Sequence, residues 1–307
     1  MPLGIAYIRG NMDMVAAHAQ IPEYRDWKDN IGFAYRMDDR SYCSDAAIHM
    51  VGHGVFYQNL SCEMKKYLLI CVTYHSDEAL HTFVESVHRA AERVKGEMQV
   101  DIEVADNGND NKGYLGGALP IYNTKAQGYD FVSISNVDLE LAPDFFEQLV
   151  KIDDKGIGWL APDIYTDKIH RHENPCMLKR PTKRNFWIWN SIYSSTLIYR
   201  LYHALYLLKS KQSKEYPPCE IYAGHGSFML FTKAFVEHNP KIHFPGFMYG
   251  EEIYLAELTR AAGLSVHYIP TLRIANVGNI NTGLINQAQK SAWSKESLSF
   301  IYDQFFR

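Results

Sequence analysis

The chain has 307 residues, of which 47% are hydrophobic and 21% are charged, and its formal net charge is −4. This length and composition are typical of a globular protein that buries a large core, either in one sizeable α/β domain or in one domain with appendages. A slightly acidic chain has no general attraction for nucleic acid, so we expect no nucleic-acid partner.

Cysteine usage and hydropathy narrow the class of protein further. The five cysteines are scattered and contain no Cys-x-x-Cys pair, which argues against a disulfide framework and against a structural zinc site. The chain has no apolar run of about 18 residues and no basic N-terminal region followed by an apolar stretch. We therefore expect a cytoplasmic protein that is soluble or bound to the surface of a membrane.

Residues 1–63 show neither a strand pattern nor an amphipathic helix pattern. We therefore expect an N-terminal extension of unknown role, and whether it is part of the domain stays open. The domain is expected to begin at residue 64. Directly after it, the apolar run Tyr67–Val72 is typical of a buried parallel strand.

The next elements form a strand, helix, strand unit. A helical pattern begins at Asp77 and continues to about Lys95, and a second strand is expected over Val100–Ala105. A glycine-rich turn around Gly113 then leads into a helix that ends near Gln127. Such an alternation predicts a largely parallel sheet covered by helices.

Asp138 follows a third predicted strand, the apolar run over 129–134. Ligands of open α/β sheets bind at the carboxyl ends of the strands, so Asp138 is a candidate metal-site or phosphate-site residue. On this feature alone, a turn or a helix cap is the more frequent role of such an aspartate. We expect a helix over 141–152, with Pro143 in its first turn, and a further strand from about Gly158.

Residues 179–216 combine basic ends with an aromatic and apolar middle that includes Trp187 and Trp189. This pattern predicts a helical insertion that lies in a membrane interface. The alternative is a buried helical hairpin or flap with solvated ends. We therefore hypothesise peripheral contact with the inner face of the cytoplasmic membrane.

The last third of the chain adds a small-residue turn before a strand, a helix opened by two glutamates, a final strand and a helical tail. These features lie at 224–231, 251–262, 266–269 and 284–307. The final strand is expected to end before Pro270, which cannot donate a ladder hydrogen bond.

Six motifs follow one another in a fixed order. They are Thr73-Tyr74, Asp106-Asn107-Gly108, the glycine-rich turn at 112–117, Asn136-Val137-Asp138, Gly224-His225-Gly226-Ser227 and Gly250-Glu251-Glu252. This order, over about residues 66–283, resembles the family 2 glycosyltransferases, inverting enzymes with a GT-A fold, and most of all their bacterial rhamnosyltransferase-like branch. The resemblance implies a GT-A domain over 64–283, with a mixed, mainly parallel sheet flanked by helices. It also implies a transferase that moves a sugar from a nucleoside-diphosphate sugar to a hydroxyl of a surface glycan, such as a lipopolysaccharide O-antigen or capsule unit.

The resemblance implies a donor site as well. Asp138 would bind a divalent ion, Mn²⁺ or Mg²⁺, because the leaving diphosphate gains negative charge. The other nucleotide-sugar ligands would be Thr73, Tyr74, Asp106, Asn107, Gly113, Asn136 and His225. UDP or dTDP is the expected nucleotide, and the acceptor would be a glycan or a lipid-linked glycan.

Glu252 would be the general base that takes the proton of the acceptor hydroxyl. The family carries a Glu-Asp pair at this helix start, whereas this chain has Glu251 and Glu252. The choice between them stays open, with Glu252 preferred. The alternative is that both acids only stabilise the helix N-terminus, which favours negative charge.

Several of these positions have a plainer alternative role. Asp106-Asn107-Gly108 on its own predicts an ordinary turn, and a lone histidine such as His225 is more often a structural hydrogen-bonding residue. Asn136 replaces the first acid of the metal motif, and Asn276 stands where many relatives carry histidine. Because asparagine is a poorer metal ligand than carboxylate or imidazole, the resemblance does not imply strong metal dependence.

Two other functions are compatible with these motifs. A nucleotidyltransferase also uses a nucleotide-binding α/β sheet and a metal carboxylate, but it presents a basic, glycine-rich loop after its first strand, which Thr73-Tyr74-His75-Ser76 is not. A non-catalytic sugar-nucleotide or glycan-binding protein is compatible with Asn136, Asn276 and the Glu-Glu pair.

Overall fold

The computed structural model describes residues 7–9, 45–51, 54–58, 64–195, 198, 215–278 and 287–307. The chain divides into two compact units, Met1–Met64 and Lys65–Arg307. The strands of the first unit are β1 (Tyr7–Arg9), β2 (Asp45–Val51) and β3 (Gly54–Gln58), and they form an antiparallel sheet in the order β1-β2-β3. The sequence did not predict this sheet, because strands this short give little periodic signal.

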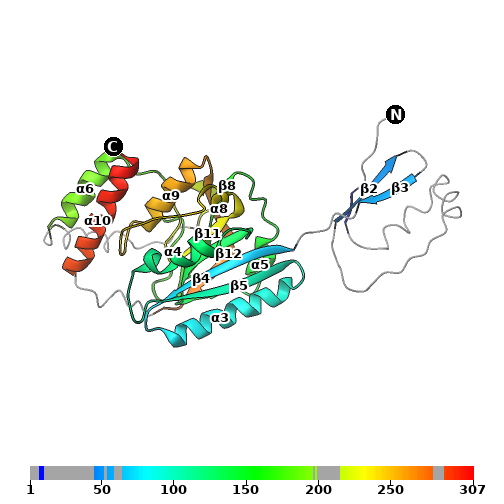
Figure 1. The fold of residues 1–307 in the computed structure, drawn as a ribbon, viewed down its shortest axis with the longest axis horizontal. Coiled ribbons are helices and arrows are strands. Elements are labelled where there is room, and N and C mark those ends of the chain that lie inside the picture. Colours follow the sequence, from blue (N-terminus) through cyan, green and yellow to red (C-terminus); the bar gives the residue numbers. More distant parts are fainter. Residues whose placement is uncertain are drawn as a thin grey trace. The chain divides into compact units, whose positions relative to one another are not determined.

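The second unit is built on a nine-stranded mixed sheet (Figure 1). Along its main path the order is β10-β12-β8-β11-β6-β4-β5, while β7 pairs with β12 and β9 with β8. Strands β4, β5, β6, β8 and β12 share one direction, and β10 and β11 run the other way. The bounds are β4 Lys65–Thr73, β5 Met98–Asp106, β6 Phe131–Asn136, β7 Leu139–Leu141, β8 Ile157–Thr166, β9 Arg171–His172, β10 Cys219–Ile221, β11 Phe228–Thr232 and β12 Ser265–Asn276.

Helices cover both faces of this sheet, and successive side chains of each strand point to opposite faces. Tyr67 and Leu69 of β4 pack in one hydrophobic cluster with α3 and α5, whereas Leu68 and Ile70 pack in the other with α4, α8, α9 and α10. The helices are α3 Asp77–Ala91, α4 Tyr114–Lys125, α5 Phe145–Leu149, α6 Lys183–Tyr193, α8 Lys233–His238, α9 Glu251–Ala261 and α10 Gln287–Phe305. The predicted α/β class, a mixed sheet flanked by helices, is confirmed.

Two predicted elements differ from the structure. The helix expected over 141–152 is shorter, because Leu139–Leu141 forms β7 against the end of β12 and α5 begins only at Phe145. The final strand does not end before Pro270 but continues to Asn276. A register shift between Ile269 and Arg273 takes the proline out of the ladder with β8, so its missing N–H leaves no strand partner unpaired.

The basic, aromatic segment is described only in part. Helix α6 begins at the capping box of Thr182 and Asn185 and ends at Tyr193. The apolar stretch from 199 to 214, which belongs to the predicted interfacial helix, lies outside the described residues. Within the described part of the chain, no helix has the length and hydropathy needed to cross a membrane.

Gly113 lies where the turn before α4 approaches the backbone of Phe247. It precedes α4 with a φ of +78° and ψ of −175°, a conformation that is essentially restricted to glycine. A Cβ at this position would lie 2.7 Å from the carbonyl carbon of Phe247 and overlap its oxygen. The turn before α4 is therefore pressed against the segment that leads into α9.

We predict that Gly113→Ala destabilises the fold far more than Gly128→Ala. Both glycines have positive φ, but a Cβ at Gly128 meets nothing within 4 Å. The Gly128 variant should therefore lose about 1–2 kcal/mol from backbone strain alone. The overlap with Phe247 should bring the Gly113 loss to about 3–5 kcal/mol. Urea unfolding of both variants measures the difference, and equal losses would contradict the close contact.

Candidate functional site

The register of the parallel strands brings three predicted site residues to one edge of the sheet. Thr73 at the end of β4 is paired with Asp106 at the end of β5, and Val72 is paired with Asn136 at the end of β6. The main-chain N–H of Asn136 donates to the carbonyl of Ser227 at 2.8 Å, which ties this edge to the turn before β11. These are carboxyl ends of parallel strands, where open α/β sheets bind ligands.

Thr73 has an unsatisfied polar group at this edge. Its side chain is 3% exposed, and its hydroxyl has no hydrogen-bond partner among the described residues. Buried hydroxyls are nearly always hydrogen-bonded, because an unmade bond costs about 1–3 kcal/mol. Thr73 therefore carries an unmade hydrogen bond at this edge of the sheet. Tyr74 follows it, 44% exposed, with its ring 4.4 Å from that of His75.

The Asp106-Asn107-Gly108 motif forms a turn, as its plainer interpretation predicted. The Asp106 carboxylate accepts the N–H of Gly108 at 2.8 Å and is otherwise exposed. Asn107 is buried, and its amide donates to the carbonyl of Gly113 at 2.9 Å. Its side chain thus holds the turn before α4 in place, while the Asp106 carboxylate remains accessible.

Asp138 lies just beyond β6 and is half-buried. A Cβ at Gly278 would collide with its carboxylate, and the N–H of Val277 donates to its carbonyl at 3.1 Å. Burial raises the pKa of the Asp138 carboxyl, although its own backbone N–H and the charge of His225 oppose the shift. Asn276 lies at the same edge and accepts the N–H of Gly278 at 3.1 Å.

The two glutamates at the start of α9 lie in different environments. Gly250, with a φ of +85°, turns the chain into the helix. Glu251 is 6% exposed, and burial together with the charge of Glu252 raises the pKa of its carboxyl to about 8. Glu252 is half-buried, and a Cβ at Gly226 would lie 2.6 Å from its Oε1. The Glu252 carboxylate therefore lies over the small-residue turn at 224–227.

His225 uses one ring nitrogen to hold this turn. Its Nδ1 lies 2.9 Å from the Ser227 hydroxyl and accepts the N–H of Ser227 at 3.3 Å. Its main-chain N–H donates to the side-chain oxygen of the buried Asn174 at 2.7 Å. Because Nδ1 accepts a backbone N–H, the proton of the neutral ring is on Nε2. His225 thus has a structural role, with Nε2 left for another partner.

Tyr114, the first residue of α4, is influenced by the charges of both Asp138 and the α9 glutamates. It was not predicted as a site residue. Burial raises the pKa of its hydroxyl well above the usual range, and the charges of Glu251, Glu252 and Asp138 add to the shift. The hydroxyl also lies 3.5 Å from the carbonyl of Ser227. The charges of carboxyl groups from two segments therefore act on this one phenol. Its place after Gly113 was the only signal in the sequence.

The described residues include no group of three His, Cys, Asp or Glu side chains that could hold a metal ion. Asp138 offers a half-buried carboxylate that forms no ion pair within the described part of the chain. A divalent ion accepts one carboxylate together with phosphate oxygens and water. The residues present therefore fit an ion that a bound diphosphate helps to hold, and do not form a complete site by themselves.

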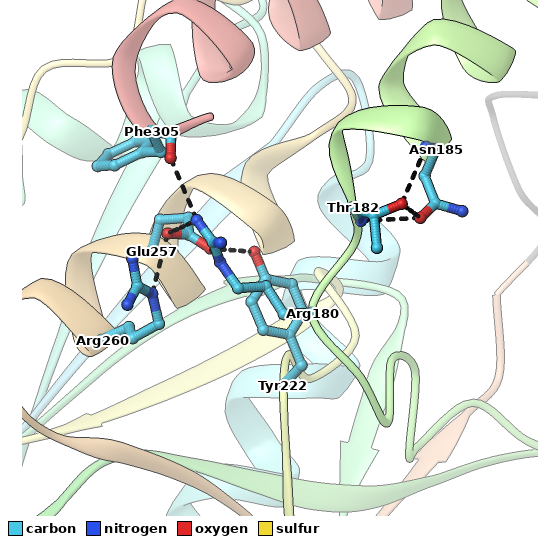
Figure 2. A network of polar contacts seen from close by, with 7 residues as sticks. All are labelled: Arg180, Thr182, Asn185, Tyr222, Glu257, Arg260 and Phe305. Carbon is cyan, nitrogen blue, oxygen red and sulfur yellow. Dashed lines mark hydrogen bonds and ion pairs between the residues drawn. The ribbon is translucent and has the colours of Figure 1, made fainter. Parts of the chain in front are cut away.

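Helix α9 is fixed in place by a buried carboxylate, Glu257 (Figure 2). Arg180 donates to both its oxygens, at 2.7 and 3.0 Å, and Tyr222 and Arg260 donate at 2.8 and 3.2 Å. Burial opposes ionisation of Glu257, but the hydrogen bonds from Arg180 and Tyr222 outweigh it and lower the pKa of the carboxyl. Arg180 also donates to the carbonyl of Phe305 at 3.1 Å. The network joins α9 to the end of α10 and to the segment before α6.

No protein-family model and no curated protein matches this sequence. Among solved structures, the catalytic domain of Drosophila β1,4-galactosyltransferase 7 with xylobiose has 14% identity and a TM-score of 0.44, over 75% of this chain and 80% of that one. GalNAc-T7 with UDP, GalNAc and Mn²⁺ has 13% identity and a TM-score of 0.43, over 78% and 48%. S. aureus TarS has 12% identity and a TM-score of 0.42, over 79% and 44%. At such identities a likeness concerns the fold and not the chemistry.

We predict that Glu251→Gln stabilises the protein increasingly as the pH rises above about 4.5, with the full gain reached above about pH 8. The raised pKa means that the folded state keeps a proton which the unfolded chain releases above about pH 4.5. Wild-type stability should thus fall as the pH rises from about 4.5 to about 8, whereas glutamine cannot lose a proton. The two unfolding temperatures should agree near pH 5 and favour the variant near pH 9.

Glu237→Gln, a change at an exposed position of α8, is the matched control and should show no such pH dependence. A constant difference between Glu251→Gln and the wild type across this range would contradict the buried, protonated carboxyl.

Proposed function

We propose that this chain is an inverting glycosyltransferase of the GT-A type, which transfers a sugar from a nucleoside-diphosphate sugar to a hydroxyl of a glycan. The observation that carries the proposal is the carboxyl edge of the sheet, where strand register brings Thr73, Asp106 and Asn136 together and the N–H of Asn136 bonds Ser227 of the turn over which the Glu252 carboxylate lies. Buried acids with raised pKa values are concentrated at functional sites.

The nucleotide would lie along the strand ends. The unpartnered hydroxyl of Thr73 and the exposed carboxylate of Asp106 are adjacent in register and can bond ribose or base groups. Tyr74 presents an exposed ring for stacking. UDP and dTDP are the proposed nucleotides. Asn107 and Gly113 would contribute by shaping the turn before α4, while Asn136 and His225 border the diphosphate.

Asp138 would hold a divalent ion, Mn²⁺ or Mg²⁺, jointly with the diphosphate. When bound, such an ion stabilises the negative charge of the leaving group. The raised pKa of the Asp138 carboxyl fits this role, because a nearby cation would favour its ionised form. The Tyr114 hydroxyl, whose pKa is raised in part by the charges of Asp138, Glu251 and Glu252, would donate a hydrogen bond to an oxygen of the sugar donor.

Glu252 is the proposed general base. As the acceptor oxygen bonds to the anomeric carbon, its proton passes to the Glu252 carboxylate and the bond to the phosphate oxygen breaks, leaving its electron pair on the diphosphate. Glu252 is half-buried over Gly226, whereas Glu251 is 6% exposed and the pKa of its carboxyl is raised. The shielded Glu251 would position its neighbour. This distinction supports the preference for Glu252.

The proposed setting is the assembly of a bacterial surface glycan, such as an O-antigen or capsule unit, on the cytoplasmic side of the membrane. The ordered motifs resembling family 2 enzymes support this part of the proposal. A non-catalytic sugar-nucleotide-binding protein is the second candidate, since Asp138 is one acid where two are usual and Asn276 is a weaker ligand than histidine.

We predict that the protein slowly releases nucleoside diphosphate from a UDP-sugar or dTDP-sugar in the presence of Mn²⁺, with water replacing the acceptor. Glu252→Gln should reduce this release about 10²-fold or more, because it removes the base. Asp138→Asn should reduce it similarly, and Glu237→Gln should leave it unchanged. Chromatography of the nucleotides measures the release.

Each other outcome has a distinct meaning. Pyrophosphate as the product would replace the proposal by a nucleotidyltransferase, and binding without turnover would favour the non-catalytic candidate. Near-normal release by both site variants would overturn the assigned residues.

A further inference from the structure

Helix α6 is held firmly by one face. The ring of Phe186 packs on Phe306 and Tyr302 of the C-terminal segment, with ring centroids 4.4 and 5.7 Å apart, and Ile192 is also buried. Arg180, just before the helix, is fixed by Glu257 and lies 4.1 Å from the Phe306 ring. The opposite face of α6 therefore has a defined orientation with respect to the rest of this unit.

This opposite face, formed by Arg184, Trp187, Ile188 and Ser191, follows helical spacing and is called the outward face of α6 here. Trp187 is 72% exposed and Ile188 is 37% exposed. Ile198, further along the chain, is 47% exposed. Large apolar side chains that cluster on a surface mark an interaction site more often than single ones do.

A groove of about 410 Å³ lies next to this face, between α6 and α10. Its apolar walls are Phe186, Trp187, Leu298 and Tyr302, with Lys183 and Asp303 among its polar residues. Asp303 accepts a hydrogen bond from Arg307 at 2.9 Å. Because Trp187 belongs both to the groove and to the outward face, the apolar surface is continuous.

The charged residues between positions 173 and 215 are all basic. Between Glu173 and Glu215 the chain has no Asp or Glu, although its net charge is −4. The basic residues of the stretch are Lys179, Arg180, Lys183, Arg184, Arg200, Lys209, Lys211 and Lys214. Lys179, Lys183 and Arg184 are exposed and have no ion-pair partner in the described part of the chain.

We propose that the outward face of α6 docks on an anionic lipid bilayer. Trp187 and Ile188 would enter the headgroup region, and Lys179, Lys183 and Arg184 would bind lipid phosphates. Exposed isoleucine gains free energy by leaving water for lipid, and it finds no equivalent environment along a polynucleotide backbone. The aliphatic component therefore favours a bilayer over nucleic acid. This docking goes beyond the proposed transfer reaction and does not require it.

Vesicle sedimentation of the full chain tests the docking. Vesicles of phosphatidylcholine with phosphatidylglycerol should bind the wild type, and phosphatidylcholine alone should bind it weakly. Each basic residue near an anionic surface contributes about 1 kcal/mol, so Lys183→Glu with Arg184→Glu should weaken binding at least about tenfold. Trp187→Ser should weaken binding to the anionic vesicles several-fold. Thermal unfolding should show that both variants remain folded.

The matched control reverses two exposed lysines elsewhere, Lys151→Glu with Lys155→Glu, and should leave binding unchanged. An equal loss of vesicle binding in this control would mean that only the overall charge matters, and it would overturn the proposal. Absence of wild-type binding to anionic vesicles would also overturn it. So would tight binding of single-stranded DNA, if the DNA displaces the vesicles and its binding is insensitive to Trp187→Ser. These results do not depend on nucleotide turnover, so failure of the docking and failure of the proposed reaction can be told apart.

Discussion

The close contact between Gly113 and the Phe247 carbonyl is the constraint on which the candidate site depends. Gly113 precedes α4, whose first residue is Tyr114, and Phe247 lies shortly before the glutamates of α9. A side chain at position 113 would separate these two segments. Because no side chain intervenes, the charges of Glu251 and Glu252 act on the Tyr114 hydroxyl while α4 remains packed on the strands that end at Thr73 and Asn136.

Around this contact, the site combines a rigid support with unsatisfied polar groups. Glu257, saturated by Arg180, Tyr222 and Arg260, fixes α9 below its first turn. At the strand ends, by contrast, the buried hydroxyl of Thr73 has no hydrogen-bond partner in the described structure. Burial also raises the pKa of the half-buried Asp138 carboxyl. Folding thus leaves unsatisfied the groups that a diphosphate, an ion and a ribose could satisfy.

The sequence predicted the parts of the fold that rest on local patterns. A continuous apolar run identified β4, and the segment over 100–105 was predicted as the next strand, β5, so the positions of Thr73 and Asp106 at the strand ends followed directly. It did not predict the bulge that carries β12 past Pro270, because only the partner strand specifies a register shift. Nor could it distinguish Glu251 from Glu252, since neighbouring helix positions point about 100° apart and tertiary packing decides which is buried. Tyr114 was missed for the same reason: Ser227, whose carbonyl lies 3.5 Å from its hydroxyl, is 113 residues away in the sequence.

Nucleotide binding tests the central claim, that the strand ends and Asp138 form a nucleoside-diphosphate site, most directly. Thermal unfolding of the wild type and of Asp138→Asn would be compared in UDP, dTDP, GDP and CMP, each with and without Mn²⁺. We expect one nucleoside diphosphate to raise the unfolding temperature of the wild type, Mn²⁺ to enlarge the increase, and Asp138→Asn to lose this enlargement. No increase with any of the four nucleotides, with or without Mn²⁺, would contradict the account.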